Sequence, residues 1–312
     1  MDHASSTVVE LKDKPRRTGS AKASPVLAMV LVVLGILVML YPVASTLWNN
    51  HLATQAAQDY AELEQNIPQD VKNTQWEKAH DYNTNRTTGP ILDPWLARFD
   101  KNNPEYREYL DQLNANDAMA RLIFPKVKVD LPVYHGTDSK TLQRGLGHLF
   151  GSDLPVGGKD THSVITGHTG LSNSTMFDNL NKAEEGDAFF VQVSGEKLKY
   201  VVDQVKVVLP TETEGLRPVA GKDYITLITC TPYGVNTHRL LVRGHRVPLD
   251  ESDEDVFDNY HGSGWQWWMY ALVAAAAAVL LTLVWWLRKQ RGDGESLEKA
   301  NEITDEGIVE DE

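Results

Sequence analysis

The sequence predicts a mostly β domain, either a closed β-barrel or a β-sandwich, placed between two membrane-spanning helices. Short β-branched and aromatic runs with a period of two fill residues 118–249. One uncharged apolar stretch precedes these runs and another follows them. The chain has 312 residues and a hydrophobic fraction of 42%, which disfavours both bulk disorder and a transporter with many spans.

Seven runs have the composition of strands. Clusters of Gly, Pro, Asn and Asp separate them at the spacing of an all-β barrel or sandwich. Two brief helical patterns interrupt the series, near Ser139–Arg144 and Ser174–Ala183. The predicted strands are ARLIF, VKVDLPVYH, HSVIT, AFFVQV, LKYVVDQVKVVL, YITLIT and HRLLVRGHRV.

The region before the strands predicts two helices joined by a loop. Residues 51–66 are good helix formers, and residues 104–113 begin with a proline that suits the first turn of a helix. The polar stretch 70–103 between them predicts a long loop. Within that loop an apolar island, Ile91 to Trp95, stands out.

Two apolar segments are long enough to cross a membrane. Val26–Leu40 and Trp267–Leu287 both fit the roughly 20 apolar residues that a bilayer core requires. Tryptophans bracket the second segment, as interfacial aromatic residues do, and a buried helix of a globular domain is rarely apolar on every face. The first segment is predicted to be an anchor, with a cleaved signal peptide as the alternative.

The cations beside these segments predict their orientation. Positive residues stay on the cytoplasmic side, so both termini are predicted to be cytoplasmic and residues 49–264 to lie outside the cell membrane. The flanking cations are Lys12, Lys14, Arg16, Arg17 and Lys22 before the first segment, and Arg288, Lys289 and Arg291 after the second.

The net charge of −13 comes mostly from two acidic segments. Residues 250–258 hold six carboxylates, and residues 293–312 hold nine against one lysine, whereas residues 49–249 have 21 cations and 25 anions. Such acidic runs predict a solvated, disordered linker and tail. The charge also disfavours nucleic-acid binding, which needs clustered cations.

These observations divide the chain into segments. The predicted segments are an N-terminal cytoplasmic segment 1–24, a membrane helix 25–47, a helical region 48–117 with a loop at about 86–100, the β domain 118–249, an acidic linker 250–265, a membrane helix 266–287 and an acidic cytoplasmic tail 288–312.

Three strand ends can bring a cysteine, an arginine and a histidine together. Cys230 ends an apolar strand, and Arg239, nine residues later, lies near the start of the next strand, so a hairpin can place them side by side. His168 follows another apolar strand, between Gly167 and Gly170, which leave room for a peptide backbone. A single cysteine excludes an internal disulfide framework and a thiolate metal cluster.

These residue types would suffice for acyl transfer. A thiol with a pKa near about 8.5 needs a nearby cation or base to become a nucleophile. An imidazole can protonate a leaving amine, and a guanidinium suits a developing oxyanion. The competing interpretation is structural, with Cys230 as a small buried hydrophobe and Arg239 on a solvated outer face. Motifs of serine hydrolases, zinc proteases and nucleotide-binding proteins are absent from the sequence.

The local sequence around these residues resembles that of sortases, the cysteine transpeptidases of Gram-positive cell surfaces. TLITCTPYGVNTHRLLVRGH (Thr226–His245) is similar to their signature, TLxTC followed by an arginine one short hairpin later. GHTG after a strand resembles their catalytic-histidine segment, and the order His, Cys, Arg also matches. The resemblance covers about residues 118–248.

Two features resemble the pilin-polymerising subgroup, class C. Asp93-Pro94-Trp95 is similar to the Asp-Pro-aromatic motif of its lid, and its members often carry a second membrane span after the barrel. The resemblance implies a closed eight-stranded β-barrel with short helices, flanked by two transmembrane helices. It also implies that Asp93 pairs with the site arginine and that Trp95 covers the sulfur.

The resemblance further implies a two-step reaction without a metal or organic cofactor. Cys230 would attack the Thr carbonyl of an LPXTG-type sorting signal, His168 would protonate the leaving amine, and Arg239 would stabilise the oxyanion. A Lys amine of a second pilin subunit would then resolve the acyl-enzyme into an isopeptide bond, building a covalent pilus. The implied partners are pilin subunits and the membrane, not nucleic acid.

Three alternatives remain. The nearest is a sortase that anchors surface proteins to the cell wall through a peptidoglycan precursor. A second is a cysteine L,D-transpeptidase, whose motif resembles S-H-G-C, but Ile228-Thr229 stand where that motif has its histidine and glycine. The third is a non-catalytic, membrane-tethered β domain that binds wall or adhesin, with Cys230 merely buried.

Overall fold

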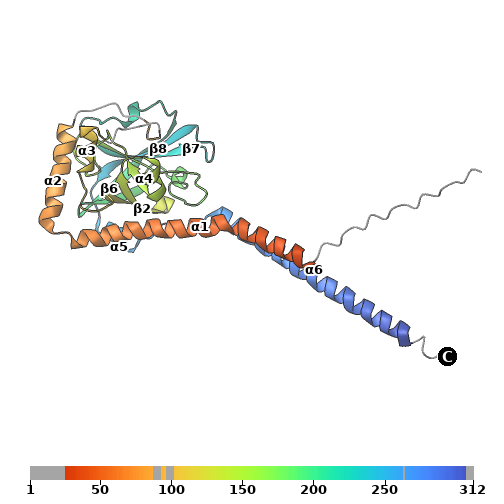
Figure 1. Ribbon diagram of the computed structural model, residues 1–312. Coiled ribbons are helices and arrows are strands. Elements are labelled where there is room, and N and C mark those ends of the chain that lie inside the picture. Colours follow the sequence, from red (N-terminus) through yellow and green to blue (C-terminus); the bar gives the residue numbers. More distant parts are fainter. Residues whose placement is uncertain (1–24, 87–92, 96–101, 263, 307–312) are drawn as a thin grey trace, which may run out of the picture. The chain divides into compact units, whose positions relative to one another are not determined.

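Residues 120–247 form a closed eight-stranded β-barrel, as predicted, and not a sandwich (Figure 1). The computed structural model describes residues 25–86, 93–95, 102–262 and 264–306, with side chains up to Lys289. Around the barrel the strand order is β1-β2-β3-β4-β7-β8-β6-β5, and β5 pairs with β1 to close it. The strands are β1 (Ala120–Phe124), β2 (Val129–His135), β3 (Leu146–His148), β4 (Thr161–Thr166), β5 (Ala188–Val193), β6 (Glu196–Val208), β7 (Asp223–Thr231) and β8 (His238–Val247).

The seven strands predicted from the period-two runs are all present. The sequence did not predict β3, which has only three residues and a central Gly147, too few to show a period. This short strand pairs in parallel with β2 and antiparallel with β4, so it closes the gap between them. Two parallel pairs, β2–β3 and β4–β7, therefore interrupt the antiparallel barrel.

Helices and 3₁₀ turns precede, connect and follow the strands of the barrel. Ser139–Arg144 is helical as predicted, whereas the pattern at Ser174–Ala183 yields only the turn η2. The helices are α1 (Pro25–Asn66), α2 (Gln69–Asn85), α3 (Pro104–Leu110), α4 (Ser139–Arg144), α5 (Glu254–Asn259) and α6 (Trp267–Glu306), and the turns are η1 (Pro125–Val127), η2 (Leu180–Lys182), η3 (Glu214–Leu216) and η4 (Glu251–Asp253).

The predicted loop 70–103 is wrong over its first half, which forms α2. This helix is polar overall but packs against the barrel because Ala79 is fully buried and Trp76 packs against the core cluster. Its Asn83 amide also exchanges two hydrogen bonds with the backbone of Leu154, at 3.1 and 2.8 Å. A few contacts to the barrel thus outweigh a composition typical of loops.

The acidic linker is also ordered, contrary to the predicted disorder. Lys199 binds the carboxylates of Asp250 and Asp253, both at 2.8 Å, and these two aspartates form a capping box at the start of η4. Phe257 of α5 is buried with its ring 5.5 Å from that of Phe190. Ion pairs to lysines of β6 and one buried aromatic side chain thus hold the segment on the barrel.

Arg121 ties this segment to the barrel interior. Its guanidinium forms a bidentate pair with Asp130, at 2.7 and 2.9 Å, and donates a third bond to the Phe257 carbonyl at 2.9 Å. All of these groups are buried, so removing the cation leaves an uncompensated carboxylate.

We therefore expect Arg121→Ala to lower the free energy of unfolding by about 3–5 kcal/mol in chemical denaturation. Lys126, in an exposed pair with Glu184 at 3.6 Å, is the matched control. Lys126→Ala should cost no more than about 1 kcal/mol, since surface ion pairs contribute little. Equal losses in the free energy of unfolding for the two substitutions would contradict a stabilising role for the buried Arg121–Asp130 ion pair.

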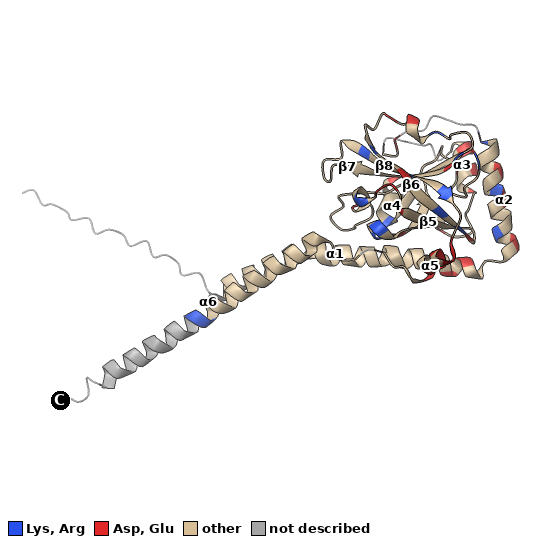
Figure 2. Ribbon diagram, turned by 180° about the vertical axis from the view of Figure 1, so that it is seen from behind, with Lys and Arg blue, Asp and Glu red and all other residues tan. Residues whose placement is uncertain are grey.

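The two long helices α1 and α6 are apolar and long enough to cross a membrane. Neither carries a charged residue along its apolar length, which runs in α6 as far as Leu287 (Figure 2). The backbone divides into two units, residues 40–274 around the barrel and the described parts of residues 1–39 and 275–312.

The helix α6 continues to Glu306, so most of the tail predicted to be disordered is helical, in keeping with its Glu, Lys and Ala residues.

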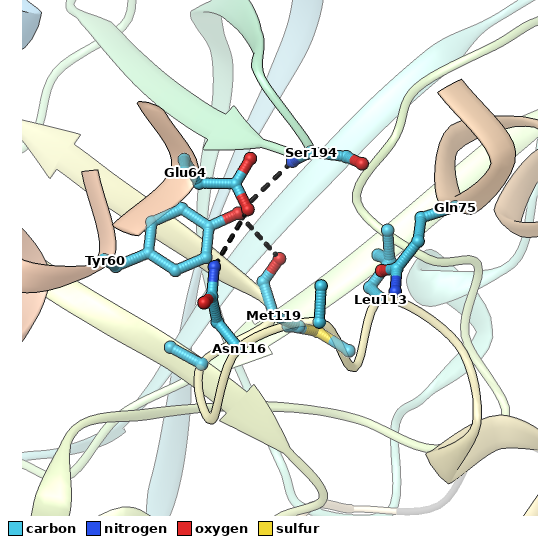
Figure 3. A pocket seen from close by; sticks show the side chains of 9 residues that line it. Tyr60, Glu64, Gln75, Leu113, Asn116, Met119 and Ser194 are labelled. Carbon is cyan, nitrogen blue, oxygen red and sulfur yellow. Dashed lines mark hydrogen bonds between the residues drawn. The ribbon is translucent and has the colours of Figure 1, made fainter. Parts of the chain in front are cut away.

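The second half of α1 lies against the barrel. Tyr60 reaches two backbone groups: its hydroxyl donates to the Met119 carbonyl and accepts from the Ser194 N–H, both at 3.2 Å (Figure 3). One turn further on, Glu64 accepts a hydrogen bond of 2.9 Å from the Asn116 amide. Buried hydrogen bonds therefore fix this part of α1 on the barrel.

Candidate active site

The β7–β8 hairpin places a thiol beside a guanidinium. Cys230 of β7 and Arg239 of β8 are directly paired across the antiparallel ladder. Both side chains are buried. The apolar residues of TLIT fix the register, because a one-residue slip would turn Leu227 out of the core.

His168 is brought to the same end of the barrel by the parallel pair β4–β7. The register ends with Thr166 opposite Ile228, and His168 and Cys230 each follow two residues later. Two further bonds hold the strands together beyond that point: the N–H of Gly167 donates to the Ile228 carbonyl at 3.1 Å, and the Thr229 hydroxyl donates to the Gly167 carbonyl at 2.8 Å. His168 and Cys230 therefore occupy corresponding positions just past the ends of two neighbouring parallel strands.

The Asp93–Trp95 segment engages the arginine. Arg239 Nε donates to Asp93 Oδ2 at 2.6 Å and Arg239 Nη2 donates to Asp93 Oδ1 at 3.1 Å, a bidentate ion pair. Both side chains are buried. Arg239 Nη1 lies 3.2 Å from the carbonyls of Asn236 and His238. Four of the five N–H donors of the guanidinium therefore bind other groups of the protein.

Trp95 lies over the same group of residues. Its ring centroid is 4.7 Å from the Arg239 guanidinium carbon, and its indole N–H donates a long bond of 3.5 Å to His168 Nδ1. The ring also packs against the apolar cluster that includes Ile228 and Leu241. A bond of 2.9 Å from the Thr137 hydroxyl to the Pro94 carbonyl holds the segment from the other side.

Burial keeps the thiol and the imidazole uncharged in this arrangement. Burial raises the pKa of the Cys230 thiol; Arg239 opposes this rise and Asp93 adds to it. Burial lowers the pKa of His168. Both groups are therefore neutral near pH 7 in this arrangement.

The structure brings together the predicted residues Cys230, His168, Arg239, Asp93 and Trp95. The rest of the predicted loop, residues 87–92 and 96–101, lies outside the described residues. Within the described part of the chain, no group of three His, Cys, Asp or Glu side chains could hold a metal ion.

Sequence reasoning missed Asp178. Its Oδ1 accepts hydrogen bonds from the Thr169 hydroxyl at 3.0 Å and from the N–H of Gly170 at 2.8 Å, directly after His168. Burial raises the pKa of Asp178 to about 6. An aspartate in a polar loop ten residues from the histidine gives no signal in the sequence.

This barrel, with a cysteine and an arginine paired at its end, is that of a sortase. The family model of the sortase domain matches residues 122–247. The chain belongs to the sortase family, whose members are cysteine transpeptidases.

Solved structures similar to this chain include pilus-related members of the family. Sortase C-1 from Actinomyces oris is 55% identical, with a TM-score of 0.55, over 57% of this chain and 99% of that one. Sortase A from Corynebacterium diphtheriae is 49% identical, with a TM-score of 0.58, over 69% of this chain and 96% of that one. Sortase C-1 from Streptococcus pneumoniae is 42% identical, with a TM-score of 0.58, over 63% of this chain and all of that one.

Among curated proteins, sortase D from Bacillus subtilis is 29% identical over 129 residues, or 40% of this chain. The matched segment spans 62% of that protein, and likewise 62% of sortase A from Bacillus anthracis. The chain thus spans a little under two thirds of the length of these curated relatives.

Proposed function

We propose that this protein is a membrane-anchored, pilin-polymerising sortase of class C. It would cleave an LPXTG-type sorting signal and join the threonine carbonyl to a lysine amine of another pilin subunit. The pairing of Cys230 with Arg239, under an Asp93–Trp95 segment that occupies the arginine, is the observation that carries the proposal. The solved neighbours include proteins described as sortase C, one of them in connection with pilin substrate specificity.

The proposed reaction begins at the thiol. The Cys230 thiolate attacks the threonine carbonyl, and the Arg239 guanidinium stabilises the negative charge that develops on its oxygen. The His168 imidazolium protonates the leaving glycine amine as the carbon–nitrogen bond breaks, leaving a thioester on Cys230. The incoming lysine amine attacks that thioester, gives up a proton to His168, and releases the thiolate as the isopeptide bond forms.

We propose that the Asp93–Trp95 segment is a lid that must move before this reaction. While Arg239 Nε and Nη2 bind the Asp93 carboxylate and Trp95 lies over the guanidinium at 4.7 Å, these two donors are not available to an oxyanion. One structure of the Corynebacterium diphtheriae protein is described as a lid mutant. Lid opening would free the arginine and admit the sorting signal in a single movement.

The membrane would hold the enzyme near its substrates. We propose that α1 and α6 both span the membrane, with both termini in the cytoplasm and the barrel outside. Sorting-signal proteins are themselves tethered to the outer face of the same membrane, so a shared plane raises the effective concentration of enzyme and substrate.

A competition between two acceptor amines tests this proposal. The full chain is incubated with an LPXTG-type peptide, a pilin-derived lysine peptide and an amine peptide of the peptidoglycan type, and products are identified by mass spectrometry. We expect a thioester on Cys230 and transfer to the lysine peptide. Transfer to the peptidoglycan amine alone would establish the wall-anchoring alternative, and absence of any acyl-enzyme from both the wild type and lid variants would contradict the proposed activity.

A further inference from the structure

His168 begins a compact loop, residues 168–178, that we call the histidine loop. The loop is closed on itself, since the Phe177 N–H donates to the His168 carbonyl at 3.0 Å. Asp178 at its end accepts two hydrogen bonds from the residues that directly follow His168, one of them from the Thr169 hydroxyl at 3.0 Å. The backbone at His168 is therefore fixed by the far end of its own loop.

The middle of the histidine loop is held by α1. Three polar residues within five positions of the helix face the loop, and two of them, Thr46 and Asn50, are buried. The hydrogen bonds run from Thr46 Oγ1 to the Ser172 carbonyl (3.4 Å), from Asn49 Nδ2 to the Asn173 carbonyl (2.8 Å), from Asn50 Nδ2 to Thr175 Oγ1 (2.7 Å) and from the Thr175 N–H to Asn50 Oδ1 (2.9 Å).

The contact with the histidine loop is separate from a second contact that holds the same helix on the barrel. Tyr60, more than two turns further along α1, already docks the helix on the barrel through Met119 and Ser194. Asn50, by contrast, uses both ends of its amide on Thr175, which lies two positions before Phe177, and its Oδ1 also accepts a long bond of 3.5 Å from the Ser174 hydroxyl. A side chain that pairs with both the backbone N–H and the hydroxyl of one residue fixes the position of that residue.

We propose that residues 46–50 of α1, and Asn50 above all, position the catalytic histidine. This inference rests on the proposed function, in which His168 transfers the proton. Asn50 does not touch the reacting atoms and acts through Thr175 and the histidine loop. In this proposal the part of α1 that follows the apolar segment Val26–Leu40 contributes to the geometry of the active site.

The physical basis is the steep dependence of proton transfer on geometry. A displacement of about 1 Å at a reacting group can cost about a hundredfold in rate. Without Asn50 the N–H of Thr175 loses its acceptor, and the loop can shift while the barrel stays folded. The loss should then fall on the chemical step and leave substrate binding, which the rest of the barrel provides, nearly unchanged.

The test compares three variants of the full chain in turnover of an LPXTG-type peptide with a lysine-peptide acceptor, each made with the wild-type lid and with Asp93→Ala. Asn50→Ala should lower kcat about tenfold or more and leave KM within about twofold. Asn50→Asp should restore most of the rate, because its carboxylate can accept from both the N–H and the hydroxyl of Thr175. Tyr60→Phe, which removes a buried hydrogen bond of the same helix elsewhere, should lower the melting temperature without lowering kcat.

The outcomes separate this inference from the proposed function. Full kcat in Asn50→Ala, or an equal loss of kcat in Asn50→Ala and Tyr60→Phe, would overturn the positioning role while leaving the transpeptidase intact. If the wild type and the Asp93→Ala variant both fail to transfer the peptide, the proposed function fails instead.

Discussion

Cys230→Ala is expected to abolish peptide transfer and to leave the fold intact. Without the thiol no acyl-enzyme can form, so kcat should fall by more than about a thousandfold. The substitution removes one sulfur from a side chain at the barrel rim and leaves the pairing of β7 with β8 unchanged, so the free energy of unfolding should change by about 1 kcal/mol at most. Turnover by mass spectrometry and a thermal melt measure the two quantities.

The opposite pattern would assign Cys230 a packing role. A variant that melts far below the wild type would show that the thiol serves the core. Retained transfer by a folded variant would show that another residue is the nucleophile. Cys230→Ser is the useful companion, since it keeps the size of the side chain but replaces the thiol by a hydroxyl that is far harder to ionise.

Asp93→Ala is expected to raise the reactivity of Cys230 roughly tenfold toward iodoacetamide near pH 7. Burial and the Asp93 carboxylate both raise the pKa of the thiol, while Arg239 lowers it. Removing Asp93 takes away a negative charge and frees the guanidinium, so the pKa of Cys230 falls. The curve of alkylation rate against pH should therefore move to lower pH.

The matched control is Asp203→Ala. Asp203 forms a similar bidentate pair with Arg243, at 2.9 and 3.2 Å, on the same strand as Arg239. Arg243 is paired with Thr226, well away from Cys230, so this variant should alkylate at the wild-type rate. Equal alkylation rates of Cys230 in the wild type and in Asp93→Ala would refute the lid proposal. If Asp203→Ala is alkylated as fast as Asp93→Ala, the faster reaction would reflect a general loosening of the barrel and not the opening of a lid.

The barrel could be predicted from the sequence because its strands are periodic and its turns carry strong breakers. The β7–β8 hairpin shows this well: two apolar, strand-forming runs, TLITC and HRLLV, flank a turn with Pro232 and Gly234, so the sequence already allows Cys230 and Arg239 to lie side by side, as they do. β3 could not be predicted, because three residues carry no period and their pairing depends on strands distant in the sequence.

Two of the wrong predictions, the loop at residues 70–103 and the disordered acidic linker, arise because local composition does not reveal tertiary contacts. Residues 69–85 are polar enough for a loop, yet Ala79 and Trp76 give them one apolar face to bury. The acidic run at 250–258 would repel itself in isolation, but Lys197 and Lys199 on β6 pair with three of its six carboxylates. In both cases the partner lies far away in the chain, where local patterns cannot show it.

The residues of the candidate site also fall into two groups, those that the sequence predicts and those that only the structure identifies. Cys230, His168 and Arg239 lie at strand ends that the sequence marks clearly, and the motif at Asp93 is visible within an otherwise polar loop. The supporting residues Asp178 and Asn50 are ordinary polar residues whose role comes only from the contacts they make. Local sequence can therefore propose the reacting groups, while the residues that position them emerge from the fold.

The most direct test of pilus building is a denaturing gel of cell-wall extracts from the native host, probed for the surface protein encoded nearest this gene. Wild-type cells should show a high-mass covalent ladder that collapses to monomer when Cys230→Ala replaces the wild-type chain. A ladder that persists unchanged in the Cys230→Ala strain would contradict the account, because the polymer would then be built without the thiol on which the proposed reaction depends.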